Sequence, residues 1–482
     1  MVGVIRIAKN SVLVLIARMT DVISSLILAG ILSRYLGVRD YGNYLFIMGL
    51  VLTITSFAHL GLPQILVREM SQNRDSMAKL VRAGLMLTSI FLCVTGLIVF
   101  SIAIISDLRS ALFLSMLVAF LSEAMVLFSG PFVSAFISFE KMQYDAAVTI
   151  VNRLLVIGLM ICVSFFDLGF ISVFVSAATA NFFRLMMILY ISNRTSTEMV
   201  PGVGKKDLIY LFKQTLPVGL SFIVTQLYLY TNLFVLEMLR GPEDVALFQA
   251  PFSIILKLQI LPAILIVAFE PVMARLAVSE TSYRYLKTVY TYIIKNLFIF
   301  CLPLTWFCFF MAKDITTFIF GDQFSNAGIS FQIIIWIIGF QFLNIFSDMV
   351  LQVIFKQQRL ILSSCVVFIS NAVLSFLLIS EYGYVGGSIA ILISAGILFG
   401  LNFYFVSRYL KGVSLSFMIK PICSFLLVLF ICSKITWLSQ PFLVVLGFLL
   451  YTVVLFALRV FSRSEFRLFV KTINERGYQL AA

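Results

Sequence analysis

Charged residues are scarce in this sequence. Asp, Glu, Lys and Arg make up only 12% of its 482 residues, whereas 61% of the residues are hydrophobic. Soluble globular domains average about 25% charged residues, so the composition excludes a water-soluble protein. No polar stretch is long enough to bury a core of its own, so the sequence has no room for a domain outside the apolar segments.

Residues that bind metals or form disulfides are also few. The single histidine is His59, and the seven cysteines contain no CxxC pair and fall within or beside apolar segments. Histidines, cysteines and carboxylates do not cluster at the spacing of a metal site. We therefore expect no cofactor. We also expect no enzymatic activity, because membrane enzymes usually need an extramembrane segment that holds bases or a metal.

Long apolar runs take up most of the chain. A helix needs about 20 mostly apolar residues, each rising 1.5 Å, to cross the hydrocarbon of a bilayer. We therefore predict an all-α polytopic membrane protein with about fourteen transmembrane helices. They cover residues 11–33, 44–66, 83–105, 111–137, 145–166, 169–191, 208–236, 245–269, 288–311, 329–355, 360–380, 384–406, 415–437 and 441–461.

The basic residues are distributed unequally between the two ends of these helices. With both termini in the cytoplasm, most of the 35 Lys and Arg fall on the cytoplasmic side, among them Arg68, Lys79 and Lys205. Cytoplasmic loops of membrane proteins carry such an excess. This orientation accounts for the net charge of +13, which attracts anionic lipid headgroups and needs no nucleic-acid partner.

Weak internal similarity divides the chain into two halves. The similar pairs are 36–44 with 240–248, and 139–141 with 355–357. Both members of each pair lie on the same predicted membrane side, which predicts two parallel lobes of six helices. The predicted domains are an N-lobe at 1–193, a cytoplasmic linker at 194–207, a C-lobe at 208–411, two further helices at 412–461 and a basic cytoplasmic tail at 462–482.

Several ionisable residues lie inside the predicted helices. A charge at the bilayer centre costs about 2.5–3.5 kcal/mol, so such side chains commonly line a water-filled cavity or pair with each other. Arg18 and Asp21 are three residues apart and can pair on one helix face. Arg153 can contribute to an anion site or pair with Glu123. Asp21 and Glu123 are therefore candidates for charge pairing or ion coupling.

Two further residues extend this set in the second half. Lys257 has no carboxylate one turn away, which favours an anionic ligand. Asp348 shares a helix face with Asn344 and can form either a contact between helices or an ion site. Five prolines between Pro217 and Pro271 favour kinked or broken helices in the same region. Beyond the last helix, basic residues at every fourth position predict a helix that lies on the cytoplasmic leaflet: Arg459, Arg463, Arg467 and Lys471.

Parts of the sequence resemble a known family. The pattern LSRYLGVRDYGNYLF from Leu32, followed by Gly61-Leu62-Pro63 and Arg68-Glu69, is similar to the start of the second helix of Wzx-like polysaccharide (O-antigen type) flippases. These flippases are members of the multidrug/oligosaccharidyl-lipid/polysaccharide (MOP) exporter superfamily. The segments 216–241 and 246–276 resemble the family's seventh and eighth helices.

The resemblance implies a V-shaped MOP fold of two six-helix lobes that opens alternately to each side of the membrane. It implies a flippase in the bacterial cytoplasmic (inner) membrane, acting in O-antigen, lipopolysaccharide or other surface polysaccharide biosynthesis. The implied substrate is an oligosaccharide linked to polyprenyl (undecaprenyl) diphosphate. H⁺ or Na⁺ are candidate coupling ions, and membrane lipids, a polysaccharide polymerase and chain-length proteins are candidate partners. Arg18 and Lys257 lie on helices that match those around the family's cavity, whereas Arg153 does not clearly do so.

Two other functions compete with this interpretation. A small-molecule or multidrug exporter of the same superfamily would favour acidic and aromatic cavity residues, and Arg18 and Lys257 oppose cationic drugs. An integral-membrane polysaccharide polymerase uses similar lipid-linked sugars but needs a sizeable extramembrane segment. The small number of basic residues in the expected cavity favours a Wzx-like protein over a lipid II flippase.

Overall fold

The computed structural model describes residues 2–73, 76–105, 110–195, 202–277, 283–435 and 440–458, together with 460 and 467. All regular secondary structure in these residues is helical. The elements are α1 (Val2–His59), α2 (Leu62–Gln72), α3 (Met77–Ile105), α4 (Ser110–Ser138), α5 (Met142–Phe165), α6 (Phe170–Thr195), α7 (Lys205–Leu239), α8 (Pro242–Leu258), α9 (Ile260–Leu276), α10 (Tyr283–Phe310), α11 (Ala312–Phe320), η3 (Asp322–Phe324), α12 (Ala327–Ile334), α13 (Ile337–Val353), α14 (Gln357–Tyr409), η4 (Leu415–Met418), α15 (Ile419–Ser433) and α16 (Gln440–Ala457). The predicted tail helix lies outside the described residues except for Arg467.

Most of these helices have the length and composition of membrane spans. Within the described residues, nine helices are long and apolar enough to cross a membrane. The helices α12 and α13 are bent by 40° relative to each other and make a tenth candidate span if they are counted as one. The helices α15 and α16 are shorter apolar helices. Each predicted span coincides with a helix, with half of one or with two consecutive helices. The chain is a multi-pass, all-helical membrane protein, and the crossing of all fourteen segments stays a prediction.

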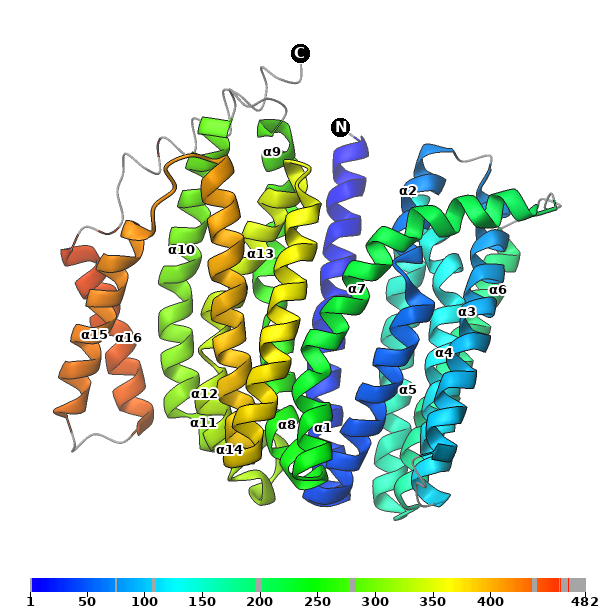
Figure 1. Cartoon of the computed structure of the whole chain (residues 1–482), viewed down its shortest axis with the longest axis horizontal. Coiled ribbons are helices and arrows are strands. Elements are labelled where there is room, and N and C mark those ends of the chain that lie inside the picture. Colours follow the sequence, from blue (N-terminus) through cyan, green and yellow to red (C-terminus); the bar gives the residue numbers. More distant parts are fainter. Residues whose placement is uncertain are drawn as a thin grey trace. The chain divides into compact units, whose positions relative to one another are not determined.

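Two of the elements, α1 and α14, each consist of two helices joined at a glycine. Gly37 has a φ of 73° and Gly383 a φ of 56°, in the left-handed region that glycine adopts without a steric penalty. At each glycine the chain reverses direction (Figure 1). The halves of α1 and α14 therefore correspond to separate predicted spans, which the nine-helix total counts once for each element.

Packing divides the chain into two compact units. The first contains Met1–Gln249 and Ile319–Gln323, and the second contains Ala250–Phe318 and Phe324–Ala482. In the first unit α4 packs against α6, and α1 packs against α5, α4 and α7. Its apolar core includes Leu66 and Met70 of α2, which are fully buried against Leu87 of α3 and Leu211 of α7. These contacts fix the helices that carry the polar side chains described below.

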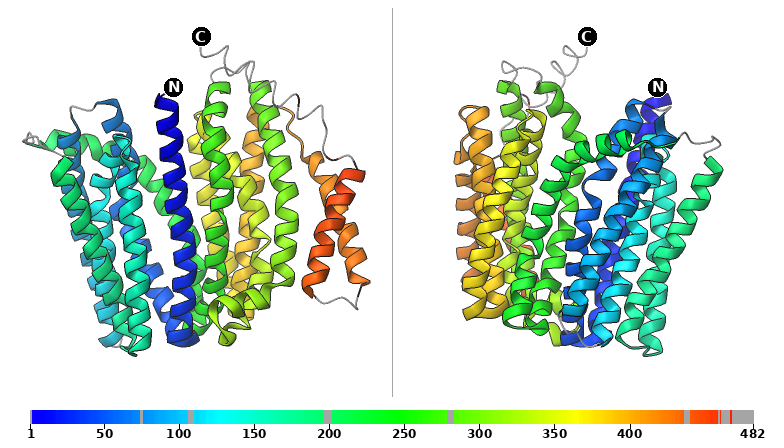
Figure 2. Two further views of the ribbon diagram at one scale, coloured as in Figure 1. Left: turned by 180° about the vertical axis from the view of Figure 1, so that it is seen from behind. Right: turned by 45° about the vertical axis from the view of Figure 1, so that its right-hand side comes forward.

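In the second unit, α13 is the central helix. It packs against α14, α10 and α9, and α12 packs against α14. The helices α15 and α16 lie side by side in both views, and α16 also contacts α10 (Figure 2). Trp306 of α10, Phe425 of α15 and Tyr451 of α16 form a separate apolar cluster there.

The two units contain the same local turn where the sequence shows internal similarity. Glu140 and Phe355 both have a φ of 57°, which is uncommon for residues other than glycine. The N–H of Lys141 donates to the carbonyl of Phe136, and the N–H of Lys356 donates to that of Leu351, each at 2.8 Å. The pair 139–141 and 355–357 thus shares a backbone conformation as well as a sequence pattern. The parallel arrangement of two six-helix lobes stays a prediction.

The boundary between the packed units lies inside α8, between Gln249 and Ala250. The predicted C-lobe instead begins at residue 208, after a linker at 194–207, and so includes most of α7. In the structure α7 packs against α1, α2 and α3. His59 stacks on Phe222 with ring centroids 4.6 Å apart, and a Cβ at Gly219 would meet the backbone of Leu60 at under 3 Å. The packing therefore assigns α7 to the first unit, while the predicted lobes describe the repeat pattern in the sequence.

Candidate functional site

Charged side chains from four helices meet in the first unit. Arg153 of α5 forms an ion pair with Asp21 of α1, through its Nη2 atom and the carboxylate Oδ1. Glu123 of α4 interacts electrostatically with Arg153 and with Arg184 of α6. Arg184 also interacts with Asp145 of α5. Two permanently charged guanidinium groups thus lie among three carboxylates, and each charge has at least one partner of opposite sign.

Amide side chains continue this cluster across α4, α5 and α6. The Nδ2 of Asn152 donates to Oδ1 of Asn181 at 3.0 Å. The Nδ2 of Asn181 in turn donates to the Ser122 hydroxyl at 2.9 Å. Asn152 is the direct neighbour of Arg153, and Ser122 that of Glu123, so this hydrogen-bond chain holds the three helices in register beside the charges.

Arg18 does not join the cluster. Its residue is exposed, and among the described residues it makes no ion pair. Asp21 therefore does not use Arg18, the partner that the helix spacing allows. Arg153, expected to contribute to an anion site or to pair with Glu123, forms an ion pair with Asp21 and also interacts with Glu123. A pair one turn apart on an exposed helix contributes only about 0.3–0.5 kcal/mol. Asp21 instead faces α5, which packs against α1, so the partner across that interface prevails.

Lys257 lies beside a break between two helices. It is half-buried in the last turn of α8, which ends at Leu258, and α9 begins at Ile260. Pro262 has no N–H to donate to the carbonyl of Leu258, which favours an interruption here. The helix is interrupted at Gln259, which keeps right-handed helical dihedral angles, so the proline-rich segment contains a local irregularity within one candidate span. The ammonium group lies near the negative end of the α8 dipole.

Asp348 accepts a hydrogen bond from an amide group of another helix. The Nδ2 of Asn402, on the second half of α14, donates to Asp348 Oδ1 at 2.7 Å and to Asn344 Oδ1 at 3.4 Å. Among the described residues, Asp348 has no basic partner. The prediction that Asp348 and Asn344 share a helix face is confirmed, and that face points toward α14.

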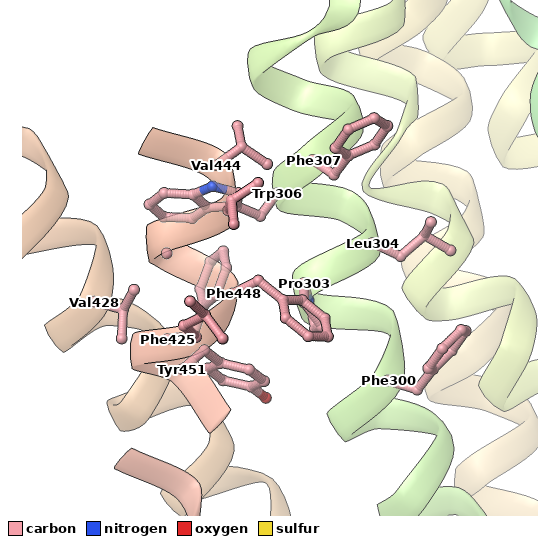
Figure 3. Close-up of a pocket in the computed structure, with 13 residues that line it drawn as sticks. Phe300, Pro303, Leu304, Trp306, Phe307, Phe425, Val428, Val444, Phe448 and Tyr451 are labelled. Atoms are coloured by element: carbon pink, nitrogen blue, oxygen red, sulfur yellow. The ribbon is translucent and has the colours of Figure 1, made fainter. Parts of the chain in front are cut away.

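An apolar pocket lies between α10, α15 and α16 in the second unit (Figure 3). Its volume is about 340 Å³, and nearly all of its lining is aromatic or aliphatic. Trp306 and Tyr451 are buried in its wall, whereas Phe300 and Phe448 are 54% and 55% exposed. A pocket of this composition accommodates a hydrocarbon chain and excludes a charged headgroup.

Sequence reasoning missed three parts of these sites. Asn402 is a polar residue inside an apolar run, the same signal that identified Asp348, and could have been found in that way. Asp145 lies in the first turn of α5 and Arg184 lies inside α6, so their pairing depends on tertiary packing. The pocket has no sequence signal, because aromatic residues occur throughout the chain. Among the described residues, no group of His, Cys, Asp and Glu could hold a metal ion.

Comparison with known families gives a match over more than half of the chain. A family model described as polysaccharide biosynthesis protein matches residues 7–277. The matched region contains Arg18, Asp21, Glu123, Arg153 and Lys257, and ends before Asp348. A search of curated proteins found no match.

Several solved structures share the fold. The lipid II flippase MurJ, in an inward closed conformation, superposes with a TM-score of 0.73 at 12% identity, over 94% of this chain and 99% of that chain. An inward-facing multidrug resistance MATE family transporter of the MOP superfamily gives 0.61 at 13%, over 83% and 96%. A MOP superfamily transporter from Pyrococcus furiosus gives 0.56 at 15%, over 84% and 95%. At such identities the likeness defines the fold, which is that of the MOP superfamily.

Proposed function

Because the chain belongs to the polysaccharide biosynthesis protein family and has the fold of MOP superfamily transporters, we propose that it is a flippase for lipid-linked oligosaccharides. The substrate is an oligosaccharide repeat unit on polyprenyl (undecaprenyl) diphosphate, and the product supplies O-antigen or another surface polysaccharide. The observation that carries this proposal is the family match, which lies within a transporter fold that covers 94% of the chain. The family is one of transporters and not of enzymes.

The physical task explains why such a fold is needed. A diphosphate and its sugars would lose their hydration in about 30 Å of hydrocarbon, which makes unaided crossing prohibitively costly. A polar cavity between two six-helix lobes replaces that water, and two packings of the lobes expose the cavity to one side at a time. In this proposal all fourteen segments cross the membrane, and the lobes form a V.

Cationic side chains would bind the diphosphate. Arg18 is exposed and makes no ion pair among the described residues, and Lys257 lies at a helix break, so both are proposed substrate contacts. Arg153 is a weaker candidate, because its guanidinium already pairs with Asp21. The apolar pocket lined by Trp306 and Phe448 is a suitable site for part of the polyprenyl chain.

The proposed location is the bacterial cytoplasmic membrane, with both termini in the cytoplasm. In the first unit, basic residues gather at the end where α7 begins. Lys79 pairs with Asp207 at 2.8 Å, and Arg68 donates to Gln214 at 3.1 Å. An excess of Lys and Arg at one end is typical of the cytoplasmic side. A polysaccharide polymerase and chain-length proteins are the proposed partners.

Reconstituted vesicles test the proposal. The purified protein should move a fluorescent undecaprenyl diphosphate oligosaccharide between leaflets, measured by loss of access to an impermeant quencher. Val445→Trp on α16, which fills the pocket, should slow transport, whereas Val453→Trp, exposed on the same helix outside the pocket, should not. Arg18→Ala combined with Lys257→Ala should also reduce transport at matched expression. Folded protein that leaves the lipid in place would refute the flippase.

The alternative is a small-molecule exporter, favoured by the fold likeness to MATE transporters. It predicts export of a cationic dye from the same vesicles and no movement of the lipid-linked sugar. Surface glycan in a strain that lacks its own flippase distinguishes the two functions in cells, because only a flippase restores the glycan.

A further inference from the structure

Basic side chains gather in the second unit where α10 begins and where α14 begins and ends. Both ends of α14 lie at the same end of this unit, because the chain reverses at Gly383 (Figure 1). In the predicted orientation this end faces the cytoplasm. Five side chains, of which the first four are exposed and the last is half-buried, form what we call the basic patch: Lys356, Arg359, Arg408, Lys411 and Lys287.

Two members of the patch lie over aromatic rings from the opposite end of α14. The Nζ of Lys356 is 5.3 Å from the centroid of the Tyr409 ring. The Cζ of Arg359 is 5.4 Å from the centroid of the Phe405 ring. A cation within about 6 Å of a ring centroid is attracted to the face of that ring. The patch is therefore an arranged surface that joins the two ends of α14.

Acidic side chains do not compensate the patch within the described residues. None of its five members forms an ion pair there. The carboxylate of Asp348, on the neighbouring helix α13, accepts a hydrogen bond from Asn402 instead. The segments that surround the patch contain no Asp or Glu: 283–310, 355–380 and 384–433.

The backbone compensates only part of this charge. The Nζ of Lys287 donates to the carbonyl of Lys411 at 3.2 Å, just beyond the end of α14, where the helix dipole favours cations. At the beginning of α14 the dipole has the opposite effect. Lys356 is the N-cap residue and Arg359 lies in the first turn, where the dipole repels cations. An anion from outside the chain would compensate these two charges.

Exposed apolar side chains adjoin the basic ones. Phe355, directly before Lys356, is 86% exposed, and Leu362, one turn after Arg359, is also exposed. Tyr404 is exposed on the second half of α14, beside Phe405. A soluble anion such as phosphate would leave these apolar side chains in water. A phospholipid has both an anionic headgroup and apolar chains, so it matches both parts of the surface.

We propose that the basic patch binds the headgroup of an anionic phospholipid from the membrane leaflet on this side. The phosphate accepts hydrogen bonds from Lys356 and Arg359, and the acyl chains lie against Phe355 and Leu362. Because the patch also includes Lys287, the bound lipid joins the start of α10 to both ends of α14. The composition of the leaflet would thereby stabilise this packing. This inference does not rest on the proposed function.

Thermal unfolding of the purified full-length protein in a neutral detergent tests the site. Added dioleoyl phosphatidylglycerol should raise the Tm to a plateau, because a ligand that binds only the folded state stabilises it. Dioleoyl phosphatidylcholine has the same chains and no net charge, and it should not produce this rise. Inorganic phosphate at the same concentration should not produce it either, which separates a lipid headgroup from a free anion.

Charge-removing variants locate the site. Lys356→Gln combined with Arg359→Gln should raise the half-saturating concentration of phosphatidylglycerol about tenfold or more, since each base near an anionic lipid surface contributes to binding. Arg194→Gln combined with Lys205→Gln is the matched control. It removes one exposed arginine and one exposed lysine from the first unit, and Arg194 likewise lies over an aromatic ring, that of Tyr190. The control should bind phosphatidylglycerol as the wild type does.

A photoactivatable phosphatidylglycerol gives a test that needs no variant. In vesicles that contain the wild-type protein, it should label peptides from 355–362 or 404–415. The proposal is overturned if labelling falls only elsewhere, if phosphatidylcholine or phosphate stabilises the protein equally, or if the double variant keeps the wild-type affinity. It is also overturned if undecaprenyl diphosphate displaces phosphatidylglycerol at lower concentrations, which would identify a substrate site. None of these measurements requires transport, so their failure leaves the flippase proposal standing, and the reverse also holds.

Discussion

The two units compensate the carboxylates inside their helices in different ways. In the first unit, Asp21 is paired with Arg153, and Glu123 lies among two arginines. In the second unit, Asp348 accepts a hydrogen bond from the amide of Asn402, which also donates to Asn344. An arginine keeps its charge at every relevant pH and compensates the charge of a neighbouring carboxylate. An amide supplies no charge, so the hydrogen bond from Asn402 does not neutralise the Asp348 carboxylate.

Removing Arg153 should have the largest effect on stability. Arg153→Ala leaves the Asp21 carboxylate without its ion-pair partner and should lower the free energy of unfolding by about 1–3 kcal/mol, since the pair is about one third exposed. Chemical or thermal unfolding of the purified protein measures this loss. The double variant Asp21→Ala, Arg153→Ala should recover part of it. Arg194→Ala, at an exposed arginine of α6, is the control. Additive losses in the double variant would contradict the pairing.

Neutralising one carboxylate in each unit should give opposite results. Asp21→Asn should lower the free energy of unfolding by about 1 kcal/mol, because Arg153 then lacks its partner. Asp348→Asn should leave it unchanged or raise it, because a charge without a cationic partner is removed from the membrane interior. Parallel Tm measurements on the two variants are sufficient. Equal destabilisation by both substitutions would show that the two units compensate their carboxylates in the same way.

The exposed pair between Lys79 and Asp207 should have the smallest effect. The side chains are 38% and 35% exposed, and such pairs contribute about 0.2–1 kcal/mol. Lys79→Ala should therefore lower the Tm only slightly, and the difference from the wild type should vanish in concentrated choline chloride, which screens exposed charges. A large effect that persists at high salt would show that this pair is more than a surface contact.

The sequence predicts the helices well because their signal is local. Each apolar run contains enough residues to form a helix and to bury its surface in lipid, so segments such as 83–105 and 145–166 coincide with α3 and α5. Glycine at 37 and at 383 marks the reversals for the same reason, since the turn needs a backbone conformation that glycine adopts readily. The segments 139–141 and 355–357 are paired by their sequence similarity, and the structure adds that both contain the same turn.

The partners of the ionisable residues could not be predicted with the same success. Spacing along one helix suggested Arg18 for Asp21, but the structure places Arg153 there, from a helix more than one hundred residues later in the sequence. The side chains that meet are set by the rotation of α1 about its own axis relative to α5. Most faces of a membrane helix are apolar, so the sequence leaves that rotation undetermined. Asp348 and Asn344 were recognised because they share one helix, whereas Asn402 comes from another.

The ion pair of Asp21 with Arg153 also determines how the first unit responds to voltage. The pair is neutral as a whole, so displacing it through the membrane potential requires no electrical work. Moving one unpaired elementary charge across the full potential changes its electrical energy by about 2.3 kcal/mol per 100 mV. The pairing therefore makes movements of α1 and α5 electrically silent at this point, whereas the membrane potential can act on Asp348 of α13, which has no basic partner among the described residues.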